Sequence, residues 1–334
     1  MKYLKISDLI PSISNTGLGT FAINGLLWRG TNEKEVTKII LTAFNKGINL
    51  IDIAPAYGFG RAEQVVGKSV QEYAERKNVV ISTKVGIAWE RGLQSRNPTS
   101  GQIFKAIDDS LKRLRTDYID ISTIYRPDPE APIEETARAM KKLYDQGKIR
   151  SIGVSNFNTE QMANFQKAAP LHFCQSNYNI FEPDIEKDII PYCRAENITL
   201  MAYRPLCRGL LSGSVKSDSK FVDCDLRKFD PKFKEPRFAQ YLKAVEKLDE
   251  FAQKKYGKRV LHLAMHWVLD QIDSGITVLG ARKSKQIEVI DELDGMKISR
   301  EGFRIIDKIV KETIKDPVGS EFMEPPSNKI INTD

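Results

Sequence analysis

The chain has 334 residues, of which 41% are hydrophobic and 28% charged, and its formal net charge is +7. This length supports one large domain or two ordinary ones. No apolar run reaches about 18 residues and the N-terminus lacks the apolar core of a signal peptide, so we expect neither a membrane span nor secretion. The charges are scattered without a basic run, which argues against a nucleic-acid partner and favours a small anionic ligand.

The cysteines are spaced neither as metal ligands nor as a disulfide framework. We therefore expect a reduced, cytoplasmic protein without a metal site. The residues concerned are Cys174, Cys193, Cys207 and Cys224.

Short apolar strands alternate with amphipathic helices along most of the chain. The strands are predicted at 15–19, 48–52, 78–84, 118–124, 149–154, 171–175, 198–203 and 275–279. The helices are predicted at 33–45, 62–76, 100–115, 132–146, 159–169, 184–197, 238–255, 260–270 and 283–293. A short hairpin at 3–13 precedes this series, and an extra helix at 300–314 follows it. Residues 1–318 are expected to form one domain and residues 319–334 a polar tail.

The alternation predicts a parallel sheet with crossover helices. Eight such units in a chain of 334 residues favour an α/β fold of the (β/α)8 TIM barrel class, with the N-terminal hairpin and the C-terminal helix as additions. A Rossmann-type sheet fits less well, because Gly17-x-Gly19 is followed by Thr20 without the third glycine of that fingerprint. Residues 206–237 interrupt the series with a long aperiodic segment, and such a segment is usually functional.

Polar or aromatic residues stand at the ends of nearly all predicted strands, where a barrel of this class places its active site. Asp52 ends one buried strand, Lys84 ends the next, and Tyr57 follows Asp52 closely. Loop polarity alone explains some of these residues, but not an acid and a lysine at the tips of neighbouring buried strands. We expect Asp52, Tyr57 and Lys84 to meet in the mouth of the barrel.

These three residues predict proton transfer. A phenol with a pKa near 10 is a poor acid or base at neutral pH, and a nearby Lys84 ammonium is expected to lower the pKa of Tyr57. Asp52 is expected to hold Lys84 charged and aimed. Such a phenol can protonate a carbonyl oxygen while a hydride reaches the carbon, and the hydride must come from a cofactor.

Seven short motifs, taken together and in order, resemble those of the aldo-keto reductase family over residues 3–293. They are Asp52-x-Ala54-x-x-Tyr57-Gly58, Ser82-Thr83-Lys84, Arg126-Pro127-Asp128, Gly153-Val154-Ser155-Asn156-Phe157, Gln175-x-x-Tyr178-Asn179, Tyr203-x-Pro205-Leu206 and Gly280-Ala281-Arg282. The resemblance implies a barrel that binds NADPH in extended form and reduces an aldehyde or ketone, so that its partner is a small-molecule carbonyl substrate.

The resemblance also implies residue roles. Tyr57 is implied as the general acid, with Lys84 and Asp52 as its tuners, and Tyr203 as the ring that stacks on the nicotinamide. Further cofactor contacts are implied at Gly19, Thr20, Asp52, Ser155, Asn156, Gln175, Arg204, Pro205, Leu206, Arg208, Gly209, Leu210, Gly280, Arg282 and Gln286. A guanidinium at Arg282 suits the 2′-phosphate of NADPH.

The chain departs from the family pattern in its predicted site. Tyr125 occupies the position of the catalytic His, so slow turnover is expected on ordinary family substrates, with cofactor binding intact. Arg204 stands where a Ser is common, and Val289-Ile290 replaces a Glu-Asn pair often found near the adenine.

The missing His leaves a second interpretation open. Potassium-channel β subunits resemble this family, lack that His and act mainly as nicotinamide-binding interaction proteins. Substrate choice is expected to depend on residues 27–31, on residues 89–98 and on the tail beyond Asp316. Trp28 and Trp89 are candidates either for pocket walls or for loop packing.

Overall fold

A computed structural model describes residues 1–10, 12–21, 32–90, 93–96, 99–128, 131–223, 225–293 and 295–319. Several sequence-based expectations fall elsewhere. Trp28 with its loop at 27–31, Cys224 and the tail from residue 320 onward lie outside the described residues, as does the side chain of Trp89.

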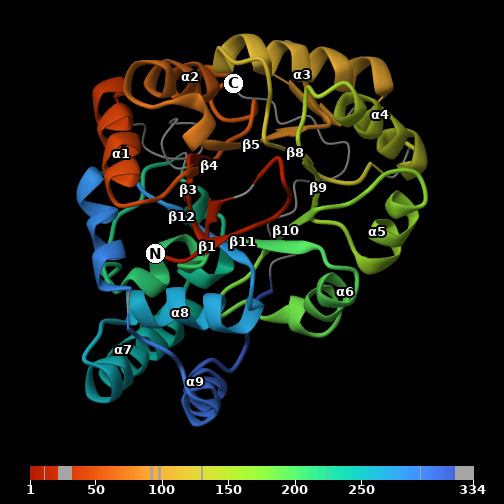
Figure 1. Ribbon diagram of the computed structural model, residues 1–334. Coiled ribbons are helices and arrows are strands. Elements are labelled where there is room, and N and C mark those ends of the chain that lie inside the picture. The colour runs from red at the N-terminus through yellow and green to blue at the C-terminus, as the bar shows by residue number, and fades with distance from the viewer. Residues whose placement is uncertain are drawn as a thin grey trace.

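In the described part of the chain, eight parallel strands close into a barrel in the order β10-β11-β12-β3-β4-β5-β8-β9 (Figure 1). They are β3 (Thr16–Gly19), β4 (Leu50–Asp52), β5 (Val80–Val85), β8 (Ile121–Ile124), β9 (Ile152–Ser155), β10 (Phe173–Asn177), β11 (Thr199–Tyr203) and β12 (Ile276–Gly280). The register pairs Gly19 with Asp52 and Asp52 with Ser82, so the strand ends meet at one rim. The predicted (β/α)8 barrel is confirmed.

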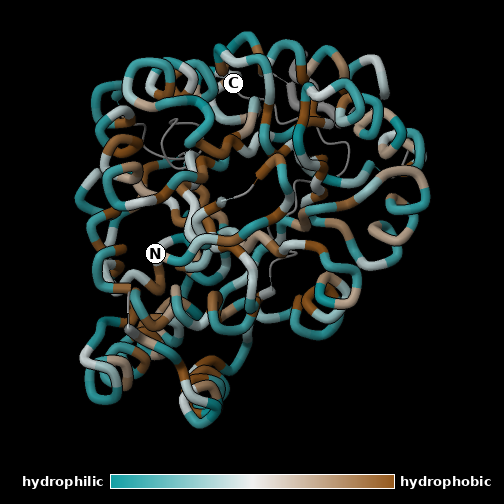
Figure 2. Tube along the Cα trace, in the orientation of Figure 1, coloured by the Kyte–Doolittle hydropathy of each residue, from teal (hydrophilic) through white to brown (hydrophobic). Residues whose placement is uncertain are grey.

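Helices surround the barrel, and the strands and the inward helix faces carry much of the apolar sequence (Figures 1 and 2). They are α1 (Glu33–Asn45), α2 (Arg61–Tyr73), α3 (Ser100–Leu114), α4 (Ile133–Asp145), α5 (Thr159–Gln166), α6 (Ile189–Ala195), α7 (Arg237–Tyr256), α8 (Val260–Ile272) and α9 (Arg300–Thr313). The extra helix α9 packs on α7, outside the ring. No helix within the described ranges is both long and apolar enough to cross a bilayer.

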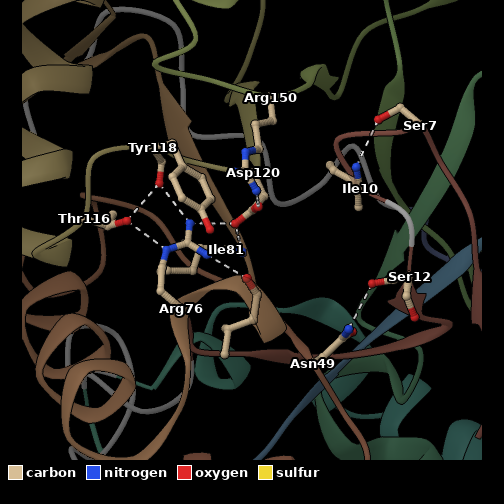
Figure 3. A network of polar contacts seen from close by, with 11 residues as sticks. Ser7, Ile10, Ser12, Asn49, Arg76, Ile81, Thr116, Tyr118, Asp120 and Arg150 are labelled. Atoms are coloured by element: carbon tan, nitrogen blue, oxygen red, sulfur yellow. Dashed lines mark hydrogen bonds and ion pairs between the residues drawn. The ribbon is translucent and has the colours of Figure 1, made fainter.

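The N-terminal hairpin closes the bottom of the barrel. Its strands are β1 (Tyr3–Leu4) and β2 (Ile13–Ser14), as predicted. Ile10 and Ile13 pack on apolar side chains that point into the barrel. The amide of Asn49, just before β4, donates to the carbonyl oxygen of Ser12 at 3.0 Å and fixes the hairpin to the barrel (Figure 3). The mouth therefore lies at the opposite, C-terminal rim.

The predicted helix at 283–293 is wrong. The chain forms two short 3-10 turns instead, η7 (Ser284–Gln286) and η8 (Glu288–Glu292). The side chain of Gln286 accepts from the backbone N–H groups of Arg282 and Lys283 at 2.8 and 3.1 Å, and Ser284 N–H donates to Glu35 of α1 at 2.9 Å. These side-chain contacts satisfy the backbone locally and hold the turn against the first helix.

Three other segments differ from expectation. Residues 184–197 form η3 (Asp184–Glu186) followed by the short α6 rather than one helix. The aperiodic segment 206–237 is folded into η4 (Cys207–Ser212), η5 (Leu226–Lys228) and η6 (Pro231–Phe233). A hairpin that was not predicted, β6 (Ile87–Glu90) with β7 (Leu93–Arg96), follows β5 on the side of the mouth.

Candidate active site

A cleft of about 250 Å³ opens where the barrel strands end. Most residues proposed from the sequence line it, although they come from distant parts of the chain. They are Gly19, Asp52, Tyr57, Lys84, Tyr125, Ser155, Asn156, Gln175, Tyr203, Arg204, Pro205, Leu206, Arg208, Gly209, Gly280, Arg282 and Gln286.

Asp52 and Lys84 form a buried ion pair at the floor of the cleft. Lys84 Nζ lies 2.8 and 2.9 Å from the two carboxylate oxygens, and its remaining donor reaches the carbonyl oxygen of Ile53 at 3.0 Å. Ser82 Oγ donates to Asp52 Oδ1 at 3.0 Å. Neither side chain is more than 6% exposed. All donors of the ammonium are used, so the pair costs little to bury and has almost no net charge.

Tyr57 lies above this pair on the turn that follows β4. Gly58, Phe59 and Gly60 all have positive φ, at 66°, 55° and 84°, and so reverse the chain into α2 within a few residues. Lys84 Nζ is 5.6 Å from the centroid of the Tyr57 ring, and the Phe21 ring meets it edge-on at 5.1 Å. The phenol is thereby held at the mouth, where a substrate can reach it.

The pKa of Tyr57 lies well above its usual range, chiefly because of burial, with further increases from the neighbouring Tyr125 phenol and the Asp52 carboxylate. The Arg204 guanidinium acts in the opposite direction. We expected a lowered pKa at Tyr57, and the net direction is upward, because Lys84 is neutralised by Asp52 at 2.8 Å and does not offset the effect of burial. Tyr57 stays protonated at neutral pH, which is the state that an acid requires.

A second wall of the cleft carries hydroxyl and amide groups. Tyr203 OH donates to Asn156 Oδ1 at 2.7 Å, and Asn156 Nδ2 donates to Ser155 Oγ at 3.0 Å and to the carbonyl oxygen of Tyr125 at 3.2 Å. Asn156 has φ 60°, a conformation that Asn tolerates better than most residues. Gln175 joins this wall from β10. These groups hold one another in place by hydrogen bonds. Their hydroxyl and amide groups can still form further hydrogen bonds to an amide of a ligand.

The segment after β11 is anchored by buried charges. Arg208 Nη1 donates to Asp230, whereas its Nε and Nη2 have no partner among the described residues. Lys232 Nζ lies 2.8 Å from Glu182 Oε1. Burial alone would raise the pKa of Glu182, but the charges of Lys232 and Arg208 bring it down to about 2. Four charges thus hold this wall of the cleft in place.

Two sequence-proposed residues do not line the cleft. Thr20 donates from both its backbone N–H and its hydroxyl to the carbonyl oxygen of Asp52, each at 3.0 Å, so it fixes the end of β4. Leu210 is fully buried in the core. Both are next to lining residues, and sequence adjacency alone does not separate an inward from an outward side chain.

Other lining residues were missed. They are Phe21, Arg126, Ser212, Ser214, Val215, Leu226, Arg227, Val278 and Ala281. Five of them lie in the aperiodic segment 206–237, whose length was the available signal. Arg227 is held by Asp225, which accepts from its Nε at 2.9 Å and from its Nη2 at 2.6 Å. This arginine and Arg282 line the same cleft.

Histidines do not contribute to the cleft lining. His172 accepts a bond from Ile152 N–H at 3.1 Å at the start of its strand, and His262 and His266 are buried on α8. Within the described ranges, no group of three or more His, Cys, Asp and Glu side chains is arranged to hold a metal ion. Proton transfer in this cleft therefore falls to phenols and cations.

Known proteins share both the sequence pattern and this architecture. The sequence profile described as "Aldo/keto reductase family" matches residues 15–311. Aldo-keto reductase YhdN of Bacillus subtilis is 47% identical over 331 residues, which cover 99% of this chain and 100% of that protein. Glycerol dehydrogenase AKR11B4 from Gluconobacter oxydans is similar in structure, with a TM-score of 0.87 and 39% identity over 96% of this chain and 99% of its own.

A more distant structure has the same fold. An aldo-keto reductase from Klebsiella pneumoniae, solved in complex with NADPH, matches with a TM-score of 0.71 at 24% identity, over 93% of this chain and 95% of its own.

Proposed function

Because this chain belongs to the aldo-keto reductase family, we propose that it is an NADPH-dependent oxidoreductase that reduces an aldehyde or ketone to an alcohol. The observation that carries this proposal is the protonated Tyr57 phenol, which is held in the cleft above the Asp52–Lys84 pair. A buried neutral phenol at the mouth of a barrel can donate its proton to a substrate bound in the cleft.

Tyr57 donates its hydroxyl proton to the carbonyl oxygen as the carbonyl carbon accepts a hydride. The C=O π pair moves to oxygen and forms the new O–H bond with that proton, while the electrons of the broken phenol O–H bond stay on Tyr57 as phenolate. Solvent later returns a proton to Tyr57. Lys84 and Asp52 hold the floor rigid beneath the phenol. Positioned acids of this kind contribute about 10²–10⁴-fold in rate.

The donor set of the cleft fits NADPH, which when bound supplies the hydride. Ser155, Asn156 and Gln175 would hold the carboxamide, and Tyr203 would stack on the ring. Arg208 offers two buried nitrogens that have no partner in the described part of the chain, on the wall of the cleft, and this suits a pyrophosphate. At the far end Arg227 and Arg282 would hold the 2′-phosphate.

A nicotinamide-binding interaction protein is the second candidate, and the Tyr at position 125 favours it. Against it, the cleft retains Tyr57 beside the hydrogen-bonded Asp52–Lys84 pair, an arrangement that cofactor binding alone does not need. The two candidates differ in whether bound NADPH reacts.

Mixing the protein with NADPH and a nitrobenzaldehyde decides between them. Because one solved relative is a glycerol dehydrogenase, glyceraldehyde belongs in the same panel. We expect loss of the reduced-nicotinamide absorbance with one alcohol formed per NADPH consumed. Tight NADPH binding without oxidation by any carbonyl of the panel would instead establish the interaction protein.

A further inference from the structure

Arg204 is an unusual residue at the catalytic end of the cleft. It directly follows β11 and has φ 59°, a left-handed conformation that a long side chain rarely adopts. It lines the cleft together with Tyr57 and Tyr125, and its guanidinium carbon lies 5.2 Å from the centroid of the Tyr203 ring. Such strain persists where the surroundings enforce it and is frequent at functional sites.

Apart from the Tyr203 ring, the Arg204 guanidinium has no partner among the residues that the structure describes. Within the described residues it forms neither a hydrogen bond nor an ion pair. Other cations of the cleft are paired: Lys84 with Asp52, and Arg208 with Asp230. Half-buried cations are normally paired, so the natural partner of Arg204 is a group that enters with the ligand.

The neighbouring charges narrow down what that group is. Lys84 is neutralised by Asp52, so it contributes little field to a negative oxygen above it. The groups that face Tyr57 are Asp52 from β4, Lys84 from β5, Tyr125 after β8, and Tyr203 with Arg204 at the end of β11. Among these, Arg204 is the cation without a counter-charge in contact.

We propose that Arg204 is a catalytic residue that hydrogen-bonds the carbonyl oxygen of the substrate beside Tyr57 and stabilises the negative charge that forms there, in place of the family's His. This inference rests on the proposed reductase function. A guanidinium has five donors and stays charged, so it can replace an imidazole that donates one bond. We therefore expect faster turnover than the missing His alone would suggest, because Arg204 supplies a hydrogen-bond donor to the carbonyl oxygen.

The same cation opposes the increase in the pKa of Tyr57 that burial causes. Removing it makes the phenol a weaker acid and raises the pKa further. Oxidation of an alcohol needs the phenolate, and its rate rises with pH through this pKa. Without Arg204 that rise must therefore move to higher pH.

The test uses Arg204→Gln, which keeps most of the side chain and removes the charge. We expect kcat/KM for aldehyde reduction to fall by about 10²–10³-fold, the usual effect of one oxyanion donor. The dissociation constant of NADPH should stay close to that of the parent, and the pH profile of alcohol oxidation should shift upward. Arg204→Lys should keep the position of the pH profile.

A rescue variant excludes simple misfolding. Tyr125→His should give little gain in the parent, but should restore at least about tenfold of the rate when added to Arg204→Gln, because only there is the oxygen donor missing. An Arg204→Gln variant with the parent's rate would overturn the proposal. So would a loss explained entirely by weaker NADPH binding with an unmoved pH profile, which would make Arg204 a pyrophosphate contact.

The proposal can be examined separately from the reductase function. A fluorinated tyrosine placed at position 57 titrates at lower pH and can be followed by its phenolate absorbance. If the protein oxidises no NADPH at all, the reductase function fails. The claim that Arg204 lowers the pKa of Tyr57 can still be tested in that case. Arg204→Gln should raise the titration midpoint of the fluorinated tyrosine, and an unchanged midpoint would refute the claim.

Discussion

The two ends of the barrel each bury an aspartate, and they surround it differently. At the N-terminal end Asp120 accepts from Arg76 at 2.7 Å, from Arg150 at 3.4 Å and from the backbone N–H of Ile81 at 2.9 Å (Figure 3). The two guanidinium carbons lie 4.0 and 3.4 Å from the centroid of the Tyr118 ring. At this end the carboxylate, the two guanidiniums and the ring all bind one another and leave no group of this cluster for a ligand.

At the C-terminal end Asp52 has one cation partner, Lys84, and the phenol of Tyr57 and the guanidinium of Arg204 remain open to the cleft. A saturated cluster can stabilise the fold but cannot respond to a ligand. An incomplete cluster gives up some stability and keeps donors and a proton for chemistry. We therefore expect changes at the bottom to lower stability without changing activity, and changes to Tyr57 and Arg204 at the mouth to lower activity with little effect on unfolding.

The largest expected effect on stability is that of Asp120→Ala. It leaves two arginines without their shared counter-charge, and breaking a buried pair typically costs about 3–5 kcal/mol. Chemical denaturation measures the loss, which should be near the lower end because both arginines reach solvent. Asp109→Ala, which breaks the exposed pair with Lys105, is the control and should cost at most about 1 kcal/mol. A lower kcat per folded molecule in Asp120→Ala would contradict the view that the N-terminal end of the barrel contributes to stability but not to activity.

Arg282→Ala concerns the adenosine end of the mouth. Loss of a charge-assisted contact to the 2′-phosphate should cost roughly 1.5–3 kcal/mol of NADPH binding. Titration with both cofactors checks this, because NADH lacks the phosphate and its affinity should not change. Lys285→Ala serves as a neighbouring control with no expected effect. Equal losses for NADPH and NADH would mean that Arg282 supports the loop and not the phosphate.

These two ends also show what the sequence could predict. The barrel, the hairpin and the meeting of Asp52, Tyr57 and Lys84 follow from strand–helix alternation and from residues at strand ends. The pairing of Lys84 with Asp52 was expected too, but its consequence for Tyr57 was not. Both carboxylate oxygens lie within 2.9 Å of Lys84 Nζ, so the lysine charge is neutralised and burial sets the direction of the Tyr57 pKa.

The prediction of a helix at 283–293 was wrong because it rested on local sequence alone. Its helical pattern is local, whereas the bond from Ser284 to Glu35 joins residues far apart in the chain. The partners of Asp120 could not be predicted from the sequence either, because Arg76, Tyr118 and Arg150 come from separate segments. Patterns of period and spacing locate elements, but long-range polar partners decide their final form.

A smaller effect on stability than that of Asp120→Ala should come from Tyr118→Leu. Removing the ring takes away its contacts with the guanidiniums of Arg76 and Arg150, each worth about 0.5–1 kcal/mol where solvent is near. Denaturation should show a loss of about 1–2 kcal/mol in total, with unchanged kcat. If the loss were absent, the arginines would be held by Asp120 alone.

The most direct test compares one hydroxyl at each end of the barrel. Tyr57→Phe and Tyr118→Phe remove the same atom, and the single-turnover rate of NADPH oxidation by a nitrobenzaldehyde is measured for both. We predict a fall of about 10²–10⁴-fold for Tyr57→Phe and the parent's rate for Tyr118→Phe, with equal NADPH affinity in all proteins. A Tyr57→Phe protein that reacts as fast as the parent would contradict the assignment of Tyr57 as the proton donor.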